Sequence, residues 1–307
     1  MADVQTFIPD VIHAHFDEAA YLYSEFQSEL NAIEPNAGYL KDVMARIDAN
    51  LEGLIINASA AKELCEAAIS NDDAGEFFAT SYLVFHSGEL DTIKTMAEAA
   101  QTNSDLLQAV ACGLAWHPWE RCVFWATKFI AAKQTAMAAI GLFSFNSYKK
   151  PLPINYSDLL KRSLAVANPV ELPLLLSIGR KNNDTSIVPI LQQSSVEVLN
   201  ATSFQLLKTR LKLGDISALT ALKPFVLSEN EHREVALELV FSQLEQSDAK
   251  QWMAELKNSP NAERFLLLAV GAMNEKSLLP WVVKQMHIPE LARIAGKVFS
   301  QLSGQDL

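Results

Sequence analysis

Hydrophobic residues recur along the start of the chain at the spacing of a helix rather than of a strand. Within residues 10–31 they advance by three to five positions and form one apolar face: Val11, Phe16, Ala19, Ala20, Tyr23, Phe26 and Leu30. A second stripe spans residues 39–54, with Leu40, Val43, Ile47, Leu51 and Leu54. The sequence contains no Asn-Gly or Asp-Gly hairpin signal. The pattern therefore predicts an all-α protein that begins with two helices.

The rest of the chain repeats a unit of two apolar helices separated by a short polar turn. Seven such turns are predicted: Ser87–Glu89, His117–Trp119, Asn146–Tyr148, Asn183–Thr185, Gly214–Ile216, Glu245–Ser247 and Asn274–Lys276. Two of them contain a glycine, Gly88 and Gly214. A period of about 30 residues is typical of an α-solenoid, in which neighbouring helix pairs share one core. We therefore predict a helical cap at 1–57 and about seven to eight helix pairs at 58–307, with an inserted loop near 147–154.

Some of these turns share specific residues. Two segments carry a glycine near the end of the first helix, an amide or acidic residue in the turn, and an aliphatic residue followed directly by proline. One contains Gly271, Asn274, Leu279 and Pro280, and the other contains Gly179, Asn183, Asp184, Val188 and Pro189. A third segment shares only the turn residues of this pattern, with Gly214 and Asp215. The segment Trp116–Pro118 differs more from the pattern. This pattern resembles short HEAT repeats, so the resemblance implies HEAT-like helix pairs.

Both ends of the chain carry a closer resemblance. Residues 278–307, 13–26 and 45–54 are similar to the end segments of a proteobacterial HEAT-type family found in gene neighbourhoods of type VI secretion. The middle matches only as a generic repeat, and the chain is shorter than many members. No catalytic residue can be transferred from that family. The resemblance implies a cytoplasmic accessory role near a secretion machine or its cargo.

Charge is unevenly distributed along the chain. The formal net charge is −11, but residues 1–110 carry −15, residues 121–223 carry +8, and residues 224–307 carry −3, with Glu120 supplying the remaining −1. An acidic chain lacks the basic footprint that nucleic-acid binding requires. The basic middle favours an acidic protein partner, whereas the acidic arm serves either a basic partner or solubility alone.

The basic residues of the middle segment are the main candidate partner-binding residues. Several lie just before predicted turns, so that the same edge of successive repeats would form a basic ridge: Lys149, Lys150, Arg180, Lys181, Lys208, Arg210 and Lys212, with Lys161 and Arg162 nearby. The alternative is structural, because cations at the end of a helix interact favourably with its dipole.

Three of the five tryptophans lie within ten residues, around the predicted turn at His117 and Pro118. Trp116 and Trp119 flank this turn, and tryptophan is enriched at binding hot spots. They are therefore candidate partner-binding residues, with core packing as the equal alternative. Trp125 has the spacing of a core residue.

Few residues of the sequence suggest catalytic or metal-binding chemistry. His13 and Asp17 share a helical face, but no further ligands complete a metal site. Cys112 and Cys122 flank His117 without an ordered catalytic set, and the odd number of cysteines favours a reducing compartment. Acidic pairs such as Glu234 and Glu238 are expected to be solvated. We therefore expect no cofactor and no metal.

Neither a secretory signal nor a membrane-spanning segment is predicted, so the cytoplasm is the expected location. The leading hypothesis is a non-enzymatic scaffold or adaptor for a protein partner, such as an effector chaperone or accessory factor of type VI secretion. One alternative is an immunity protein whose acidic arm masks a basic toxin. The other is an enzyme resembling the HEAT-like alkylpurine DNA glycosylases, which use aromatic residues in a basic cleft.

Overall fold

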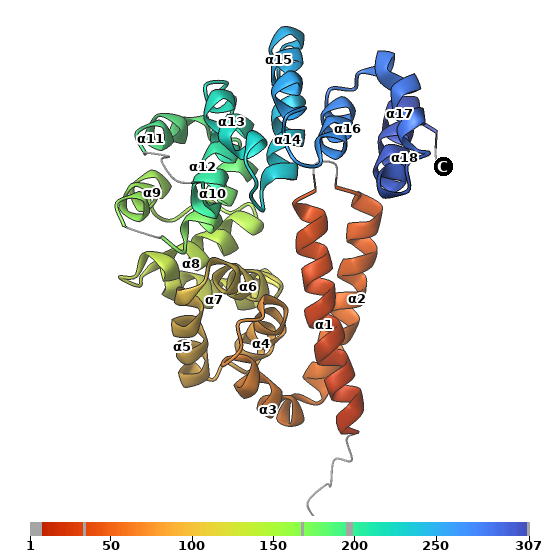
Figure 1. The fold of residues 1–307 in the computed structure, drawn as a ribbon. Coiled ribbons are helices and arrows are strands. Elements are labelled where there is room, and N and C mark those ends of the chain that lie inside the picture. Colours follow the sequence, from red (N-terminus) through yellow and green to blue (C-terminus); the bar gives the residue numbers. More distant parts are fainter. Residues whose placement is uncertain (1–7, 33–34, 167–168, 195–198, 306–307) are drawn as a thin grey trace, which may run out of the picture. The chain divides into compact units, whose positions relative to one another are not determined.

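The computed structural model describes residues 8–32, 35–166, 169–194 and 199–305. These residues form α-helices and short 3-10 helices joined by turns, and none of them lies in a strand (Figure 1). The all-α prediction is therefore confirmed for the described residues. Contacts divide the chain into two compact units, Met1–Asn182 and Asn183–Leu307. Within the described ranges, no helix is both long and apolar enough to cross a membrane.

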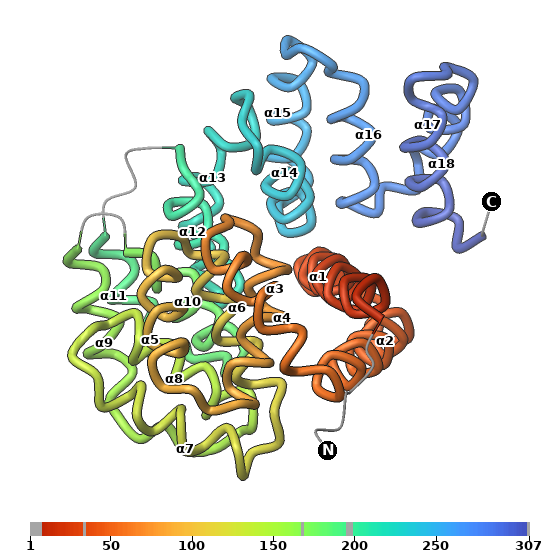
Figure 2. Tube along the Cα trace, turned by 90° about the horizontal axis from the view of Figure 1, so that it is seen from below, coloured from red at the N-terminus to blue at the C-terminus, as the bar shows by residue number. Residues whose placement is uncertain are grey.

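The first unit begins with a hairpin of α1 (Pro9–Leu30) and α2 (Ala37–Ile56), which Figure 2 shows side by side. The two predicted N-terminal helices are thus confirmed. Side chains join the helices across the hairpin: His15 bonds to Asn50 (2.8 Å) and Tyr39 donates to Glu25 (2.9 Å). Because the later residue on α1 pairs with the earlier one on α2, the helices run antiparallel.

The hairpin packs closely on α4 (Ala74–Ser87). Tyr23 stacks on Phe78 with ring centroids 4.4 Å apart. Beside this contact, a Cβ atom on Gly75 would lie only 2.3 Å from the carbonyl oxygen of Ala20. Glycine at position 75 therefore allows the backbones of α1 and α4 to approach each other, and the hairpin belongs to the first unit's core.

In the rest of the first unit, four alternate helices along the chain pack on one another in succession. The stacked helices are α4, α6 (Ser104–Ala115), α8 (Thr135–Ser147) and α10 (Leu172–Lys181). The other elements are α3 (Ala58–Ala68), α5 (Leu90–Ala99), η1 (Ala100–Thr102), α7 (Trp119–Ile130) and α9 (Tyr156–Leu164). The loop between α8 and α9 covers the predicted insertion near 147–154.

The second unit continues the alternation of helices. In chain order it contains η2 (Thr185–Ile187), α11 (Val188–Gln192), α12 (Ala201–Lys212), α13 (Ala218–Leu227), α14 (Arg233–Phe241), α15 (Gln246–Leu256), α16 (Ala262–Ala272), η3 (Lys276–Leu278), α17 (Leu279–Gln285) and α18 (Pro289–Ser303). Helix α14 packs on α16, and α16 packs on α18. Phe225, Phe241 and Leu267 are fully enclosed in this unit's core.

Three turns of the second unit share one geometry. Each starts with a residue in the left-handed region (Asn183, Gly214 and Asn274) and continues with a carboxylate. That carboxylate accepts hydrogen bonds from the backbone N–H and the hydroxyl of a serine two positions later: Asp184 from Ser186, Asp215 from Ser217 and Glu275 from Ser277. All seven predicted turns lie within two residues of a boundary between two helices.

Candidate functional site

The turn between α6 and α7 is fixed by Trp116, one of the candidate partner-binding residues. Its indole packs edge-on against Phe26 of α1 and Phe78 of α4, with ring centroids 5.4 Å and 5.2 Å apart. Its Nε1 donates a hydrogen bond of 2.7 Å to Asp48 of α2. Trp116 is half-buried, so it connects the turn to three other helices and leaves only part of the ring accessible.

The next residue, His117, is only 1% exposed. Its ring stacks on Tyr82, with centroids 4.1 Å apart, and its Nε2 lies 2.9 Å from the backbone oxygen of Tyr82. Burial lowers the pKa of His117 to about 4, against the opposing effect of that hydrogen bond. The imidazole is therefore neutral at pH 7, with Nε2–H as the donor, and it serves the packing of the turn.

Trp119, on the other side of the turn, faces α8 and the loop that follows it. Its indole packs against the rings of Phe145 and Tyr148, with ring centroids 5.0 Å and 5.3 Å apart. The ammonium of Lys150 lies 5.4 Å from the centroid of the Trp119 ring. Lys149 is exposed and adopts a left-handed conformation, with φ of 52°. The structure thus brings Lys150 to Trp119, and Lys149 precedes Lys150 in the same loop. We call Trp119, Tyr148, Lys149 and Lys150 the Trp119 edge.

The hydroxyl of Tyr148 fixes this edge to the preceding turn. It donates to the backbone oxygen of His117 and lies 3.2 Å from that of Ala115. Ala115 is the last residue of α6, where helix geometry leaves carbonyl groups without intrahelical partners, and His117 lies in the turn that follows. Burial raises the pKa of Tyr148, so the hydroxyl keeps its proton and remains a donor.

Arg180 and Lys181 lie in the last turn of α10, also in the first unit. Arg180 is half-buried, and burial lowers the pKa of its guanidinium. Lys181 is exposed, and its charge lies close enough to Cys112 to favour the thiolate there. Both positions suit the interaction of cations with a helix C-terminus. Their role in binding a partner stays a prediction.

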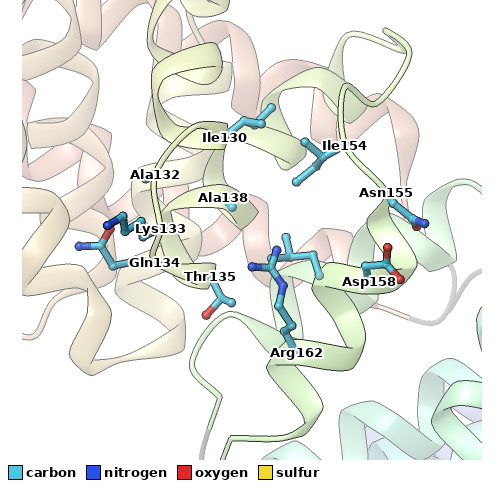
Figure 3. A pocket seen from close by; sticks show the side chains of 11 residues that line it. Ile130, Ala132, Lys133, Gln134, Thr135, Ala138, Ile154, Asn155, Asp158 and Arg162 are labelled. Carbon is cyan, nitrogen blue, oxygen red and sulfur yellow. The ribbon is translucent and has the colours of Figure 1, made fainter.

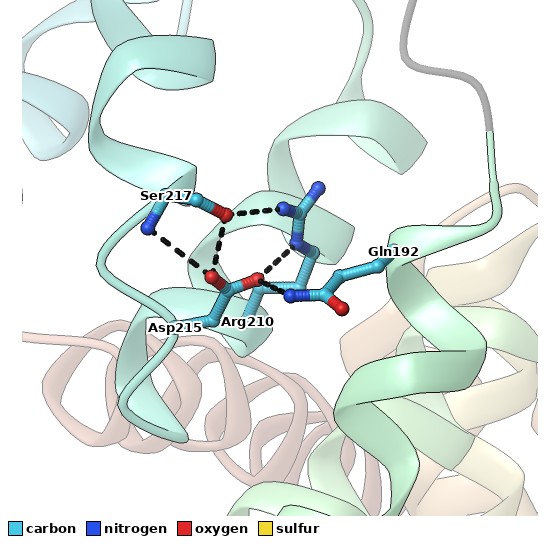
Figure 4. A network of polar contacts seen from close by, with 4 residues as sticks. All are labelled: Gln192, Arg210, Asp215 and Ser217. Carbon is cyan, nitrogen blue, oxygen red and sulfur yellow. Dashed lines mark hydrogen bonds and ion pairs between the residues drawn. The ribbon is translucent and has the colours of Figure 1, made fainter.

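In the second unit, Lys208, Arg210 and Lys212 lie on α12, and Arg210 is part of a polar network (Figure 4). Its Nε donates to Asp215 at 2.8 Å and its Nη2 to Ser217 at 3.0 Å. Gln192 of α11 donates to the same carboxylate at 3.0 Å. Arg210 therefore has a structural role. Lys212 is exposed and Lys208 is half-buried. Binding of a partner by these three residues stays a prediction.

Asp215 is the acceptor at the centre of this network. Burial alone would raise the pKa of its carboxyl, but hydrogen bonds from Ser217, Arg210 and Gln192 outweigh burial and lower the pKa to about 2. The carboxylate is thus ionised across the physiological range. It joins the turn after α12 to both α12 and α11.

The thiols show no sign of activation. Cys65, Cys112 and Cys122 are buried and free, and burial raises each pKa to about 11. A nucleophilic cysteine requires a lowered pKa, so these residues behave as small apolar side chains.

Among the described residues, no cluster of histidine, cysteine and carboxylate side chains could hold a metal ion. His15 bonds to Asn50 across the N-terminal hairpin. Trp125 is 8% exposed, as the core prediction required. Glu238, however, was expected to be solvated and is instead partly buried, which raises its pKa against the effect of Lys297 at 3.8 Å.

Sequence reasoning also missed a cavity of about 340 Å³ in the first unit, lined by residues from α7, α8, α9 and the two loops between them (Figure 3). Its charged residues are Lys133, Asp158 and Arg162. The sequence indicates only that Lys161 and Arg162 belong to the basic middle segment.

No family model, no curated protein and no solved structure matches this chain.

Proposed function

We propose that the chain is a HEAT-like α-solenoid that acts as a non-enzymatic scaffold, and that its Trp119 edge binds an acidic segment of a protein partner. The regular placement of helix pairs and turns supports the architecture, because proteins of this kind usually act through an extended surface. The resemblance of both chain ends to a family near type VI secretion genes favours an adaptor or effector chaperone as the specific role.

One observation carries the proposal: the ammonium of Lys150 lies 5.4 Å from the Trp119 ring, next to the exposed Lys149. An indole that is half-buried, packed against two aromatic rings and contacted by a cation combines an aromatic anchor with charge. Binding hot spots are enriched in such anchors. Two uncompensated lysines favour a carboxylate-rich partner and speed its association. Among the described residues, neither lysine forms an ion pair within the chain.

A quantitative pull-down with two charge-reversed variants tests this proposal. Lys149→Glu combined with Lys150→Glu reverses the charge of the Trp119 edge. Lys276→Glu combined with Lys284→Glu reverses the charge of two exposed lysines of the second unit. We expect the first variant to lose the partner recovered by the unchanged protein, and the second to retain it. With the purified partner, calorimetry should show at least about tenfold weaker binding for the first variant only.

Equal recovery by both variants would refute binding at the Trp119 edge. If the recovered partner is a basic toxin and both variants retain it, the immunity hypothesis gains support instead. A DNA mobility shift at low salt checks the glycosylase alternative, because binding to phosphates is strongest there. Absence of a shift at micromolar protein would exclude that alternative.

A further inference from the structure

The cavity of the first unit lies where the end of α7 and the start of α8 meet one face of α9 (Figure 3). Its volume of about 340 Å³ falls at the lower end of the range for small-molecule sites. Apolar side chains form part of its wall, with Ile130 from α7 and Ile154 from the loop before α9 on one side. Ala138 and Leu159 complete the apolar part.

Arg162 brings a positive charge to this cavity. Figure 3 shows its side chain extending from α9 toward the space enclosed by Ile130 and Ile154. Arg162 is exposed, and the described residues offer it no ion pair. Asp158 lies one helical turn earlier on α9 and also lines the cavity, without forming an ion pair to Arg162. The five donors of this guanidinium are therefore available to a ligand.

The first turn of α8 adds further donors to the same wall. Gln134 occupies the N-cap position and lines the cavity, but its side chain makes no capping hydrogen bond. The first N–H groups of α8 thus have no side-chain acceptor, and the helix dipole adds partial positive charge at this end. The start of α9 differs, because Asn155 caps it by accepting from the N–H of Ser157 at 3.0 Å.

We propose that this cavity binds a small monoanion with a short apolar body, such as a carboxylic acid. The carboxylate would accept hydrogen bonds from Arg162 and the first turn of α8, and the apolar body would lie against Ile130 and Ile154. Lys133 and Arg162 together with Asp158 give the cavity a net charge of one positive unit. A monoanion balances that charge, whereas a dianion would meet repulsion from Asp158.

Titration of the isotope-labelled protein with hexanoate, followed by NMR, tests this proposal at neutral pH, where the carboxylic acid is ionised. We expect saturable shifts confined to amides around Ala132–Ala138 and Asn155–Arg162. Arg162→Gln should weaken binding by on the order of tenfold, because a charge-assisted hydrogen bond is lost. Asp158→Asn should strengthen binding by several-fold.

Lys161→Gln is the matched control, because Lys161 is the adjacent residue on α9, also exposed and outside the cavity lining. It removes the same charge from the same end of the helix, so only a ligand in the cavity distinguishes the two variants. Equal weakening by Lys161→Gln and Arg162→Gln would overturn the proposal, since the effect would then be general electrostatics.

Three further probes define the ligand class. The neutral analogue hexanamide should bind at least tenfold more weakly than hexanoate, because it lacks the charge. Acetate and inorganic phosphate, which both lack the apolar body, should bind more weakly than hexanoate. Binding of hexanamide equal to that of hexanoate, or tighter binding of phosphate, would contradict a monoanion site with an apolar wall.

Discussion

Arg210 and Asp215 form an ion pair of 2.8 Å whose side chains are only 11% and 6% exposed. The pair joins the end of α12 to the turn after it, and Gln192 extends the network to α11 (Figure 4). Substituting Asp215→Ala leaves a largely buried guanidinium without its partner. We expect a loss of about 2–4 kcal/mol in the free energy of unfolding, measured by urea denaturation.

Asp184 provides the control for this prediction. It makes the same two hydrogen bonds to Ser186, but no ion pair is seen for it among the described residues. Asp184→Ala should therefore cost only about 1 kcal/mol, the usual value for a lost cap. Similar losses for the two variants would show that the serine bonds, and not Arg210, stabilise the turn after α12.

Tyr148→Phe tests how the Trp119 edge is held in place. The substitution removes the hydroxyl that donates to the carbonyl of His117. We expect a cost of about 1 kcal/mol and faster hydrogen exchange at the start of α7, because the turn loses a tie to α8. Tyr82→Phe keeps the ring that stacks on His117 and should change both quantities little. Loss of stability in Tyr82→Phe alone would contradict this account.

The helices and their turns were predictable from the sequence because they depend on local spacing. Phe16 and Tyr23 have helical spacing, and both are buried. The predicted apolar face is wrong at positions where no other helix packs against the side chain. Val11 belongs to the predicted apolar face of α1, but it is 46% exposed.

The candidate site was less predictable, because it depends on contacts between residues distant in sequence. Trp116 and Asp48 are 68 positions apart, and nothing local to either residue indicates their hydrogen bond. The cavity likewise combines Ile130 with Arg162. Conversely, the positions of Arg180 and Arg210 near helix ends were recognised, but their partial burial was not. Local sequence shows where a cation lies along a helix and not what packs over it.

His117 should make stability depend on pH. Its folded pKa of about 4 lies below the ordinary value of about 6.5, so the unfolded chain binds a proton first as pH falls. The free energy of unfolding is unaffected above pH 6.5 and declines between pH 6.5 and 4. At pH 5 this one group should account for about 2 kcal/mol of the loss.

Denaturation of His117→Gln at pH 7.5 and pH 5 isolates this contribution. Glutamine retains a donor for the carbonyl of Tyr82 but does not titrate. The variant is expected to be less stable than the unchanged protein at pH 7.5, and its stability should fall less on acidification. An identical pH dependence in both proteins would mean that His117 does not keep a lowered pKa.

Several glycines lie inside helices and not at the predicted turns, and there they allow close packing. Gly75 faces the carbonyl of Ala20 across the contact between α1 and α4. Because a Cβ atom would lie 2.3 Å from that oxygen, Gly75→Ala must push the helices apart. We expect a loss of about 2–3 kcal/mol and faster hydrogen exchange in α1 and α2.

Gly38→Ala serves as the control, since its Cβ would meet only the side chain of Asn36, at 3.3 Å, in the first turn of α2. It should leave stability unchanged or raise it slightly, because alanine favours the helix. If Gly75→Ala were as stable as Gly38→Ala, the hairpin could not depend on a close approach of α1 to α4.

The three thiols should be unreactive until the protein opens. With a pKa of about 11, each is only about 0.1% thiolate at pH 8, compared with roughly a quarter for an ordinary cysteine. Reaction with the aromatic disulfide DTNB should therefore be slow in buffer and should accelerate with urea as the fraction of unfolded protein rises. Ser59→Cys, at an exposed position of α3, should add one rapidly reacting thiol. Rapid modification of any native cysteine in buffer would contradict the packing role assigned to it.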